Sequence, residues 1–265
     1  MDTLLITLVS LAVLTLLTGL VLKPSKKKPV VIQPIPENYR QLLAEQVEFY
    51  KQLNADKRQE FEKRVQSFLA QVKITGVNTT VEDIDRVFIA ASAVIPIFSF
   101  AGWEYVNLHE VLLYPDSFNH DFEQQGNDRN VLGMVGNGAY NRIMILSQHE
   151  LRQAFINKTG KTNTALHEFV HLIDKTDGSV DGIPEFILQQ QYILPWLQLM
   201  QKEIKKILDD KSDINPYGAT NEAEFFAVVS EYFFERPELL QQKHPELYQL
   251  LSTIFKQQSA EPAVL

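Results

Sequence analysis

The chain begins with a long run of apolar residues. Residues Thr3 to Leu22 contain no charged side chain, and about 20 helical residues are enough to cross the ~30 Å hydrocarbon core of a bilayer. Asp2 precedes this run and four lysines follow it, at positions 23, 26, 27 and 28. A cleaved signal peptide would have positive charge before the run and a cleavage site of small residues after it. The pattern therefore favours a retained transmembrane anchor over residues 1–22, rather than a signal peptide or a buried core helix.

The charges after the run set its expected orientation. Lysines are more frequent on the cytoplasmic side of membrane helices, so we expect a single pass through the cell membrane, with the N-terminus outside and the remaining chain in the cytoplasm. Residues 23–36 contain four prolines as well as the lysines, which predicts an extended basic linker. A folded domain is then expected over residues 37–258, followed by a tail over residues 259–265.

The first part of the domain has the spacing of helices. Apolar residues recur at three- and four-residue intervals between Glu37 and Val72, and Asn54 is a suitable cap between two helices. A third and strongly apolar helix is expected from Val81 to Ile95, ending before Pro96.

The middle of the domain has the pattern of strands. Residues 103–114 and 140–147 are rich in β-branched and aromatic side chains and lie between turn signals. The glycines at 133, 136 and 138 indicate a turn or a kink rather than a dinucleotide-binding loop. Helical patterns return from about Asn163, and we expect further helices over about 185–208, over 221–234, and from Pro237 or Pro245 to about 257. This order predicts an α+β fold, with a small mixed sheet flanked by helices.

Composition narrows the chemistry that the domain can perform. The chain has no cysteine, which excludes a thiolate nucleophile, so any metal needs histidine and carboxylate ligands. The formal net charge is −8, and it becomes −11 when residues 1–28, with four lysines and one aspartate, are left out. A domain with this charge is not expected to bind nucleic acid through its overall field. The lysine cluster is expected to contact anionic lipid headgroups instead.

One segment has the pattern of a metal-binding helix. His167, Glu168 and His171 form a His-Glu-x-x-His motif in an uncharged stretch, after a cap signal at Thr162 and Asn163. The four-residue spacing places both imidazoles on one helix face, where they can hold one zinc ion. Glu168 lies about 100° around the helix, which suits a general base acting on water. The alternative is an amphipathic helix with two hydrogen-bonded histidines, but an unpaired carboxylate buried there would be costly.

A catalytic zinc ion of this kind needs a third protein ligand. Glu224 is the preferred candidate because it lies on a separate downstream helix, as in zinc enzymes with two histidines and one glutamate. The same residue also fits a capping box with Asn221, which would give its carboxylate a local role. The other candidates for the third ligand are Glu231, Asp177 and His149.

Two further carboxylates are candidates for supporting the ligands. Glu231 lies seven residues after Glu224 on the same helical face, so it is either a fallback ligand or a partner for an imidazole N–H. Asp174 shares a helix face with His167 and His171. It is expected either to accept an imidazole N–H or to bond to the loop after the helix.

These segments resemble a known family. The stretches HEFVHLIDKTDGSVDGIPE and NPYGATNEAEFFAVVSEYFFERPELL are similar to the MtfA-like zinc metallopeptidases, also called the DgsA anti-repressor family. The likeness is strong over residues 164–255 and weaker over residues 42–147, and the apolar N-terminus lies outside it. The chain departs from the family's usual Gly-Glu-Ala-Trp run at residues 136–140, which read GNGAY, so we expect a changed substrate groove.

The resemblance implies a zincin-like fold and a set of site residues. It implies one zinc ion held by His167, His171 and Glu224, with Glu168 as the base. It also implies that Tyr217, in the YGA turn, assists the oxyanion, which a phenol near the metal can do by donating a hydrogen bond. Turn chemistry alone would make Tyr217 an ordinary turn residue.

The sequence thus predicts a membrane-tethered zinc metallopeptidase with a peptide or protein substrate and a regulatory role. Residues 140–147 are expected to form a sheet edge that pairs with an extended peptide. The rival hypothesis is a membrane-anchored regulator that binds a transcription factor, with weak or incidental hydrolysis. A third reading is a zinc hydrolase that acts on non-peptide amides.

Overall fold

The computed structural model describes residues 34–126, 128–136, 138, 141–157 and 159–257. The described residues belong to one compact unit. The expected transmembrane anchor, the linker up to residue 33 and the tail lie outside the described residues. Within the described ranges, no helix is long and apolar enough to cross a membrane.

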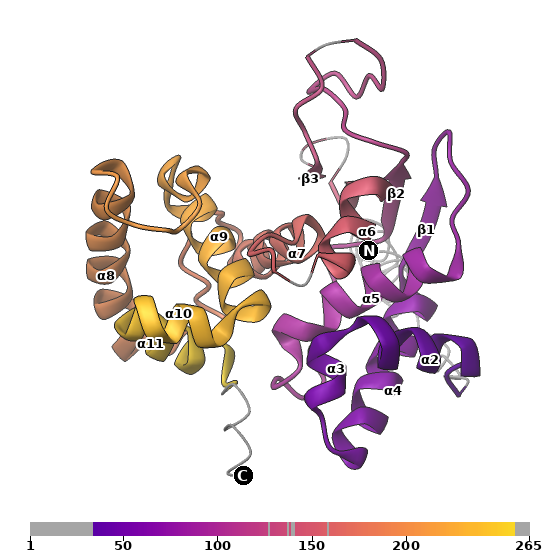
Figure 1. The fold of residues 1–265 in the computed structure, drawn as a ribbon, viewed down its shortest axis with the longest axis horizontal. Helices are drawn as coiled ribbons and strands as arrows, with labels where there is room; N and C mark the ends of the chain where they lie inside the picture. Colours follow the sequence, from indigo (N-terminus) through magenta and orange to yellow (C-terminus); the bar gives the residue numbers. More distant parts are fainter. Residues whose placement is uncertain (1–33, 127, 137, 139–140, 158, 258–265) are drawn as a thin grey trace, which may run out of the picture. The chain divides into compact units, whose positions relative to one another are not determined.

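Three helices begin the described part of the chain (Figure 1). They are α2 (Glu37–Gln46), α3 (Glu48–Gln52) and α4 (Ala55–Gln71). The helical pattern before Asn54 is interrupted at Val47, whose backbone is extended with φ −98° and ψ 103°. Asn54 caps α4 as predicted, because its side chain accepts a hydrogen bond from the Lys57 N–H at 3.0 Å.

The next helix, α5 (Asp83–Ile97), runs through the proline that was expected to follow its end. The prediction of an end before Pro96 was therefore wrong. A proline in a helix removes one backbone hydrogen bond, but every residue from Val87 to Ile97 is buried. The burial of this apolar helix outweighs the lost hydrogen bond, since apolar area contributes about 25 cal/mol per Å².

The sheet has four short strands in the order β1-β2-β4-β3. They are β1 (Lys73–Gly76), β2 (Glu110–Tyr114), β3 (Gly133–Val135) and β4 (Ile143–Ser147). Strands β1, β2 and β4 are parallel, and β3 pairs antiparallel with β4. The expectation that residues 140–147 form a sheet edge is wrong, because β4 has a neighbour on each side. The edge strand beside β4 is β3.

Alternating residues of the strands pack into two separate apolar clusters. On one face, Val111 and Leu113 of β2 join the main core. On the other face, Tyr114 of β2 and Ile145 of β4 pack with the β2–β3 connection. The segment before β2 was expected to be part of the strand, but pairing begins only at Glu110.

The remaining described elements are helical. They are α6 (Gln148–Ile156), α7 (Thr164–Asp174), the 3-10 turn η2 (Lys175–Asp177), α8 (Gln190–Leu208), the 3-10 turn η3 (Pro216–Ala219), α9 (Glu222–Glu235), α10 (Pro237–Lys243) and α11 (Pro245–Phe255). Helix α7 contacts α5 on one side, α9 on the other, and strands β3 and β4, and Figure 1 shows it in this central position. The expected α+β fold with a small mixed sheet flanked by helices is confirmed.

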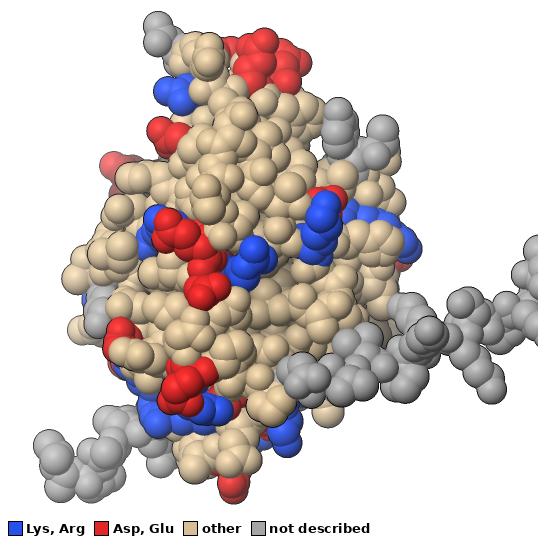
Figure 2. Space-filling view, turned by 90° about the vertical axis from the view of Figure 1, so that its right-hand side faces the viewer, with Lys and Arg blue, Asp and Glu red and all other residues tan. Residues whose placement is uncertain are grey.

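One face of the domain shows how its charges are distributed. Figure 2 shows acidic and basic side chains interspersed among uncharged residues, without a continuous basic patch on that face. A nucleic-acid backbone needs several phosphates to be neutralised together, and this face offers no such surface.

Candidate metal centre

Helix α7 presents the first two candidate ligands from a well-capped start. The Asn163 side chain accepts the Leu166 N–H at 3.0 Å, which satisfies one of the free donors at the helix N-terminus. His167 and Glu168 are buried, with exposed fractions of 8% and 6%. His171 lies one turn after His167, and the two rings meet edge to face with centroids 4.7 Å apart. The helix thus fixes both imidazoles on the same side.

Helix α9 supplies the third candidate ligand from its first turn. The Asn221 side chain accepts the Glu224 N–H at 2.9 Å, so the backbone of Glu224 belongs to the helix cap. The Glu224 carboxylate lies beside the histidines, with its Oε2 at 2.9 Å from His167 Nε2 and 3.5 Å from His171 Nε2. The cap interpretation is confirmed, and it leaves the ligand interpretation open, because the cap uses the backbone N–H while the carboxylate faces the histidines.

The spacing of these three groups fits a small metal ion. The two Nε2 atoms of His167 and His171 are 3.1 Å apart, and among the described residues this trio is the only set of three His, Asp or Glu side chains whose ligand atoms lie within 4.8 Å of one another. A tetrahedral zinc ion with bonds of ~2.05 Å separates its ligand atoms by about 3.3 Å. The observed separations lie on both sides of that value.

The hydrogen bonding of His167 also fits a metal. Glu231 Oε1 lies 2.7 Å from His167 Nδ1, and a carboxylate in this position holds the proton on Nδ1 and leaves a lone pair on Nε2. Three lone-pair atoms, from two imidazoles and one carboxylate, then face one point. Such a donor set suits a divalent cation.

Hydrogen bonds between the histidines and the neighbouring carboxylates strongly shift the pKa values of His167 and Glu224. Burial opposes a charge on His167, but its hydrogen bonds with Glu224 and Glu231 raise its pKa to about 10. Burial likewise opposes ionisation of Glu224, but its hydrogen bonds with His167 and His171 lower its pKa to about 2. The cluster therefore concentrates negative charge around the imidazoles and favours a positive charge between them.

Glu168 lies beside this trio without belonging to it. Burial raises the pKa of its carboxyl group, although the two histidines lower it. Strand β3 approaches the residue closely: a Cβ built on Gly133 would lie 2.9 Å from Glu168 Cγ, 3.0 Å from Glu168 Oε1 and 2.7 Å from Thr164 Cγ2. A side chain at position 133 would therefore displace Thr164 or Glu168. The sequence pattern predicts only a turn or kink at Gly133, because a contact across 35 residues leaves no local signal.

Tyr217 lies in the turn η3 at the edge of the site. The residue is 53% exposed, and the centroid of its ring is 6.0 Å from that of His167. The Asn215 side chain accepts the Tyr217 N–H at 3.0 Å and so fixes the turn. Partial burial and the nearby carboxylates of Glu224 and Glu168 raise the pKa of the phenol. The hydroxyl therefore remains a hydrogen-bond donor at neutral pH.

The other candidate residues lie elsewhere. Asp174 is fully buried, and its Oδ2 accepts the Gly182 N–H at 2.8 Å, which corresponds to the loop-bonding alternative. Asp177 is exposed and accepts the N–H of Ser179 at 2.9 Å. His149 is exposed on α6. None of these three belongs to the trio of converging ligand atoms.

The site opens into a cleft of about 1050 Å³. Strand β3 forms one wall of this cleft, and the turn η3 lies on its lining as well. The apolar side chains of Leu132 and Val180, which are 38% and 47% exposed, also line it. The volume of the cleft lies at the upper end of the range of pockets that bind organic ligands, about 300–1,000 Å³.

Comparison with known proteins identifies the family. The family model for the glucose-regulated metallo-peptidase M90 matches residues 22–256. The chain belongs to this metallopeptidase family. The resemblance to MtfA-like peptidases predicted from the sequence is thereby confirmed, and the family implies a bound metal.

Individual relatives agree with this assignment. An uncharacterized protein of Synechocystis is 30% identical over 247 residues, which cover 87% of each chain. The Mlc titration factor A of Pectobacterium atrosepticum is 27% identical over 220 residues, or 77% of this chain and 81% of the relative. The protein of the same name from Serratia proteamaculans is 30% identical over 185 residues, or 64% of this chain and 68% of the relative.

Proposed function

We propose that this M90 family member is a zinc-dependent peptidase with one zinc ion held by His167, His171 and Glu224. The observation that carries the proposal is the convergence of these three side chains, with Nε2 and Oε2 atoms 2.9–3.5 Å apart. It is supported by the family's metallopeptidase activity class and by the cleft that leads to the site. Zinc is preferred over harder metals because two of the three ligands are imidazoles.

The residues around the trio divide the chemistry among them. Zinc held by His167, His171 and Glu224 would supply Lewis acidity, which polarises a carbonyl oxygen and lowers the pKa of water to about 7. Glu168 accepts the proton of the attacking water and later passes it to the leaving amine, a role that its raised pKa favours. Tyr217 donates a hydrogen bond to the developing oxyanion. Glu231 holds the orientation and the tautomer of His167 through the 2.7 Å contact at Nδ1.

The substrate is proposed to be an extended peptide that pairs with β3. This strand is the sheet edge beside the cleft, so its outer backbone groups are available for pairing. Main-chain pairing gives affinity with little dependence on sequence, and apolar side chains such as Leu132 and Val180 would then select among substrates.

The alternative function is a membrane-anchored regulator that binds a transcription factor. The observation in its favour is the name Mlc titration factor A of several relatives, which describes an effect on a regulator rather than cleavage. In this alternative the cleft binds a protein partner and hydrolysis is incidental.

The substitution Glu168→Gln distinguishes the two functions. The variant keeps its zinc because Glu168 is not a ligand, and its peptidase kcat falls by about 10²–10⁴ because the proton acceptor is lost. Both quantities are measured on zinc-loaded protein with mixed peptides, and the biological effect of the variant is measured in cells. A variant that has lost hydrolysis but keeps the full biological effect contradicts the peptidase as the functional unit and supports the binding regulator.

The location of the domain is a separate proposal that rests on the N-terminal sequence. We propose that the apolar run at residues 3–22 anchors the chain in the cell membrane with the peptidase domain in the cytoplasm. In intact spheroplasts the domain is then protected from an added protease and remains with the membrane fraction. Cleavage of the domain in intact spheroplasts, or its recovery without membrane, contradicts this orientation.

A further inference from the structure

The candidate ligands come from two helices, so the metal centre depends on how α7 and α9 are held together. His167 and His171 lie on α7, whereas Glu224 lies in the first turn of α9. The first N–H groups of a helix have no partner within the helix. Asn221 caps one of them, but the position of this turn relative to α7 has to come from other contacts.

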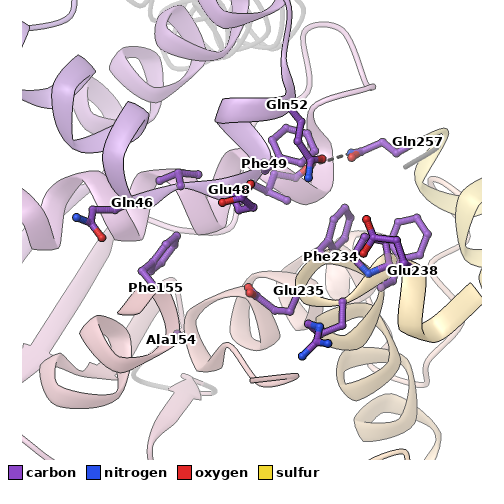
Figure 3. A pocket seen from close by; sticks show the side chains of 15 residues that line it. Gln46, Glu48, Phe49, Gln52, Ala154, Phe155, Phe234, Glu235, Glu238 and Gln257 are labelled. Atoms are coloured by element: carbon purple, nitrogen blue, oxygen red, sulfur yellow. Dashed lines mark hydrogen bonds between the residues drawn. The ribbon is translucent and has the colours of Figure 1, made fainter. Parts of the chain in front are cut away.

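The later turns of α9 are hydrogen-bonded to the start of α7. Glu231 Oε2 accepts the backbone N–H of Asn163 at 2.6 Å, and Glu235 Oε1 accepts its side-chain N–H at 2.8 Å. Figure 3 shows Glu235 in the wall of a separate cavity of about 380 Å³, whose lining shares no residue with the metal cleft. These bonds fix the end of α9 that is remote from Glu224.

The start of α9 is contacted by the loop that follows η2. Gly182 in this loop has φ +76°, a backbone conformation that favours glycine. A Cβ built on it would lie 2.3 Å from the carbonyl oxygen of Glu222 and 3.1 Å from the backbone nitrogen of Ala223. The loop backbone therefore packs directly on the first peptide bond of α9, just before Glu224.

Two fully buried side chains hold both backbone groups of Gly182. Asp174, the last residue of α7, accepts the Gly182 N–H through Oδ2 at 2.8 Å. The other oxygen of Asp174 has no donor among the described residues. Trp196 of α8 donates its Nε1–H to the carbonyl oxygen of Gly182 at 2.7 Å. The loop is thus attached to the end of the metal-binding helix and to α8 at the same residue.

The indole of Trp196 also packs on α9 itself. Its centroid lies 5.9 Å from that of Phe225 and 5.7 Å from that of Phe226. These two residues follow Glu224 directly, and the peptide bond that Gly182 contacts precedes it. The backbone of Glu224 is therefore held on both sides by one connected group of residues.

We propose that Asp174, Gly182 and Trp196 are positioning residues that hold the Glu224 carboxylate at the two histidines. Asp174 lies three residues after His171 on the same helix. Its hydrogen bond to Gly182 therefore transmits the position of the metal-binding helix to the first turn of α9. The inference rests on the proposed zinc site, because the three residues act on zinc only through its third ligand.

The first test compares two glycines of the same segment in the full chain, with zinc affinity measured by chelator competition. Gly182→Ala should weaken zinc binding by about 10–100-fold, as expected when a group that orients a ligand is lost. Gly178→Ala is the matched control. Gly178 also has a positive φ, +103°, but a Cβ built there would meet none of the described residues within 4 Å, apart from its chain neighbours. This variant should keep the wild-type zinc affinity.

The second test separates the hydrogen bond of Asp174 from its charge. Asp174→Asn keeps an oxygen that can accept the Gly182 N–H, so its zinc affinity should stay within about twofold of wild type. Asp174→Ala removes the acceptor and should weaken zinc binding about tenfold. If the alanine variants fail to fold by circular dichroism, Trp196→Phe decides. It keeps an aromatic ring, removes the donor to Gly182, and should weaken zinc binding about fivefold.

Three results would overturn the proposal. One is wild-type zinc affinity in Gly182→Ala, or in Trp196→Phe where that variant decides. Another is an equal loss of affinity in Gly182→Ala and Gly178→Ala, which assigns the effect to backbone strain. The third is an equal loss in Asp174→Asn and Asp174→Ala, which assigns it to charge.

Hydrogen exchange of the metal-free chain separates this inference from the proposed function. A wild type that binds no zinc contradicts the zinc peptidase but leaves the support of α9 measurable. The amides of residues 224–228 should then exchange roughly tenfold faster in Gly182→Ala than in Gly178→Ala. Equal exchange rates in the two variants contradict the positioning role.

Discussion

Two buried histidines of this domain have nearly the same immediate partners but different surroundings. His167 lies between Glu231 at Nδ1 and Glu224 at Nε2, at 2.7 and 2.9 Å. His244 lies between Glu203 at Nδ1 and Asp213 at Nε2, at 3.2 and 2.8 Å. A tyrosine ring also lies near each histidine. The ring centroid of Tyr217 is 6.0 Å from that of His167, and the ring centroid of Tyr232 is 6.2 Å from that of His244. A histidine between two carboxylates is therefore not by itself a metal site.

The two clusters differ in the side chains that form ion pairs with their carboxylates. Asp213 accepts hydrogen bonds from Lys161 and Lys243 at 2.6 and 3.0 Å, and Glu203 accepts one from Lys206 at 2.6 Å. At the other histidine, the ion-pair partners of Glu224 and Glu231 among the described residues are histidines. Lysines make the His244 cluster a closed set of ion pairs, whereas the carboxylates of the His167 cluster have no lysine or arginine partner among the described residues, which favours a bound cation there.

The largest expected contrast involves the two tyrosines. Tyr217→Phe should lower kcat by about 10²–10³, the cost of removing one oxyanion donor, without changing zinc content. Tyr232→Phe removes the hydroxyl that donates to Asp213 at 2.9 Å. It should leave kcat unchanged and destabilise the fold by about 1.5 kcal/mol. Steady-state kinetics and thermal unfolding measure both variants, and a Tyr217→Phe enzyme with full kcat rules out the proposed donor.

The supporting carboxylates give a smaller contrast. Glu231→Gln should weaken zinc binding by about 10–100-fold, because the carboxylate that orients His167 is lost. Glu203→Gln makes the corresponding change beside His244 and should leave zinc affinity unchanged while lowering Tm. Competition with a chelator measures both affinities. Equal zinc binding by Glu231→Gln and the wild type would remove the functional distinction between the two clusters.

Gly133 of β3 lies close to Glu168 in the His167 cluster. Substitution at this contact should have a smaller effect on kcat than the substitutions above. Gly133→Ala places a methyl group against Glu168 and should lower kcat roughly tenfold by displacing the base, with zinc content preserved. Gly160→Ala is the control, because its added Cβ would meet no atom closer than 3.3 Å. If Gly133→Ala retains full kcat, the close approach has no functional role.

The smallest expected effect is the pH dependence of stability at His244. Its hydrogen bond to Glu203 raises the pKa of His244, and Asp213 adds to this although burial opposes it. Protonated His244 therefore stabilises the fold fully below the unfolded pKa of about 6.5, and this contribution is lost as pH rises through the higher folded pKa. His244→Gln should lower Tm by roughly 4 °C at pH 6, and the difference from wild type should shrink toward pH 9. A constant difference between pH 6 and 9 contradicts a charged His244.

The sequence predicted the local part of the site and missed the part that depends on distant contacts. The helix with its Asn163 cap follows from spacing within about ten residues. Strands β1 and β3, with four and three residues, are too short to show a period, so the edge strand was placed at 140–147. The lysines that distinguish His244 from His167 come from three different segments, and only the folded chain brings them together.

The sequence also left one choice open that packing resolves. Glu224 was both a cap residue and a ligand candidate, and the fold separates the roles of its backbone and its carboxylate. Glu231 was a fallback ligand candidate, and its position at His167 Nδ1 makes it the hydrogen-bond partner of a candidate ligand.

Zinc content after dialysis decides whether the His167 cluster holds the metal. We expect one zinc ion per chain in the wild type and in Glu203→Gln, and a large loss of zinc in Glu224→Ala, with all three proteins folded by circular dichroism. Full zinc retention by Glu224→Ala, together with loss of zinc in Asp177→Ala, would contradict the assignment of the metal to the His167 cluster with Glu224 as its third ligand.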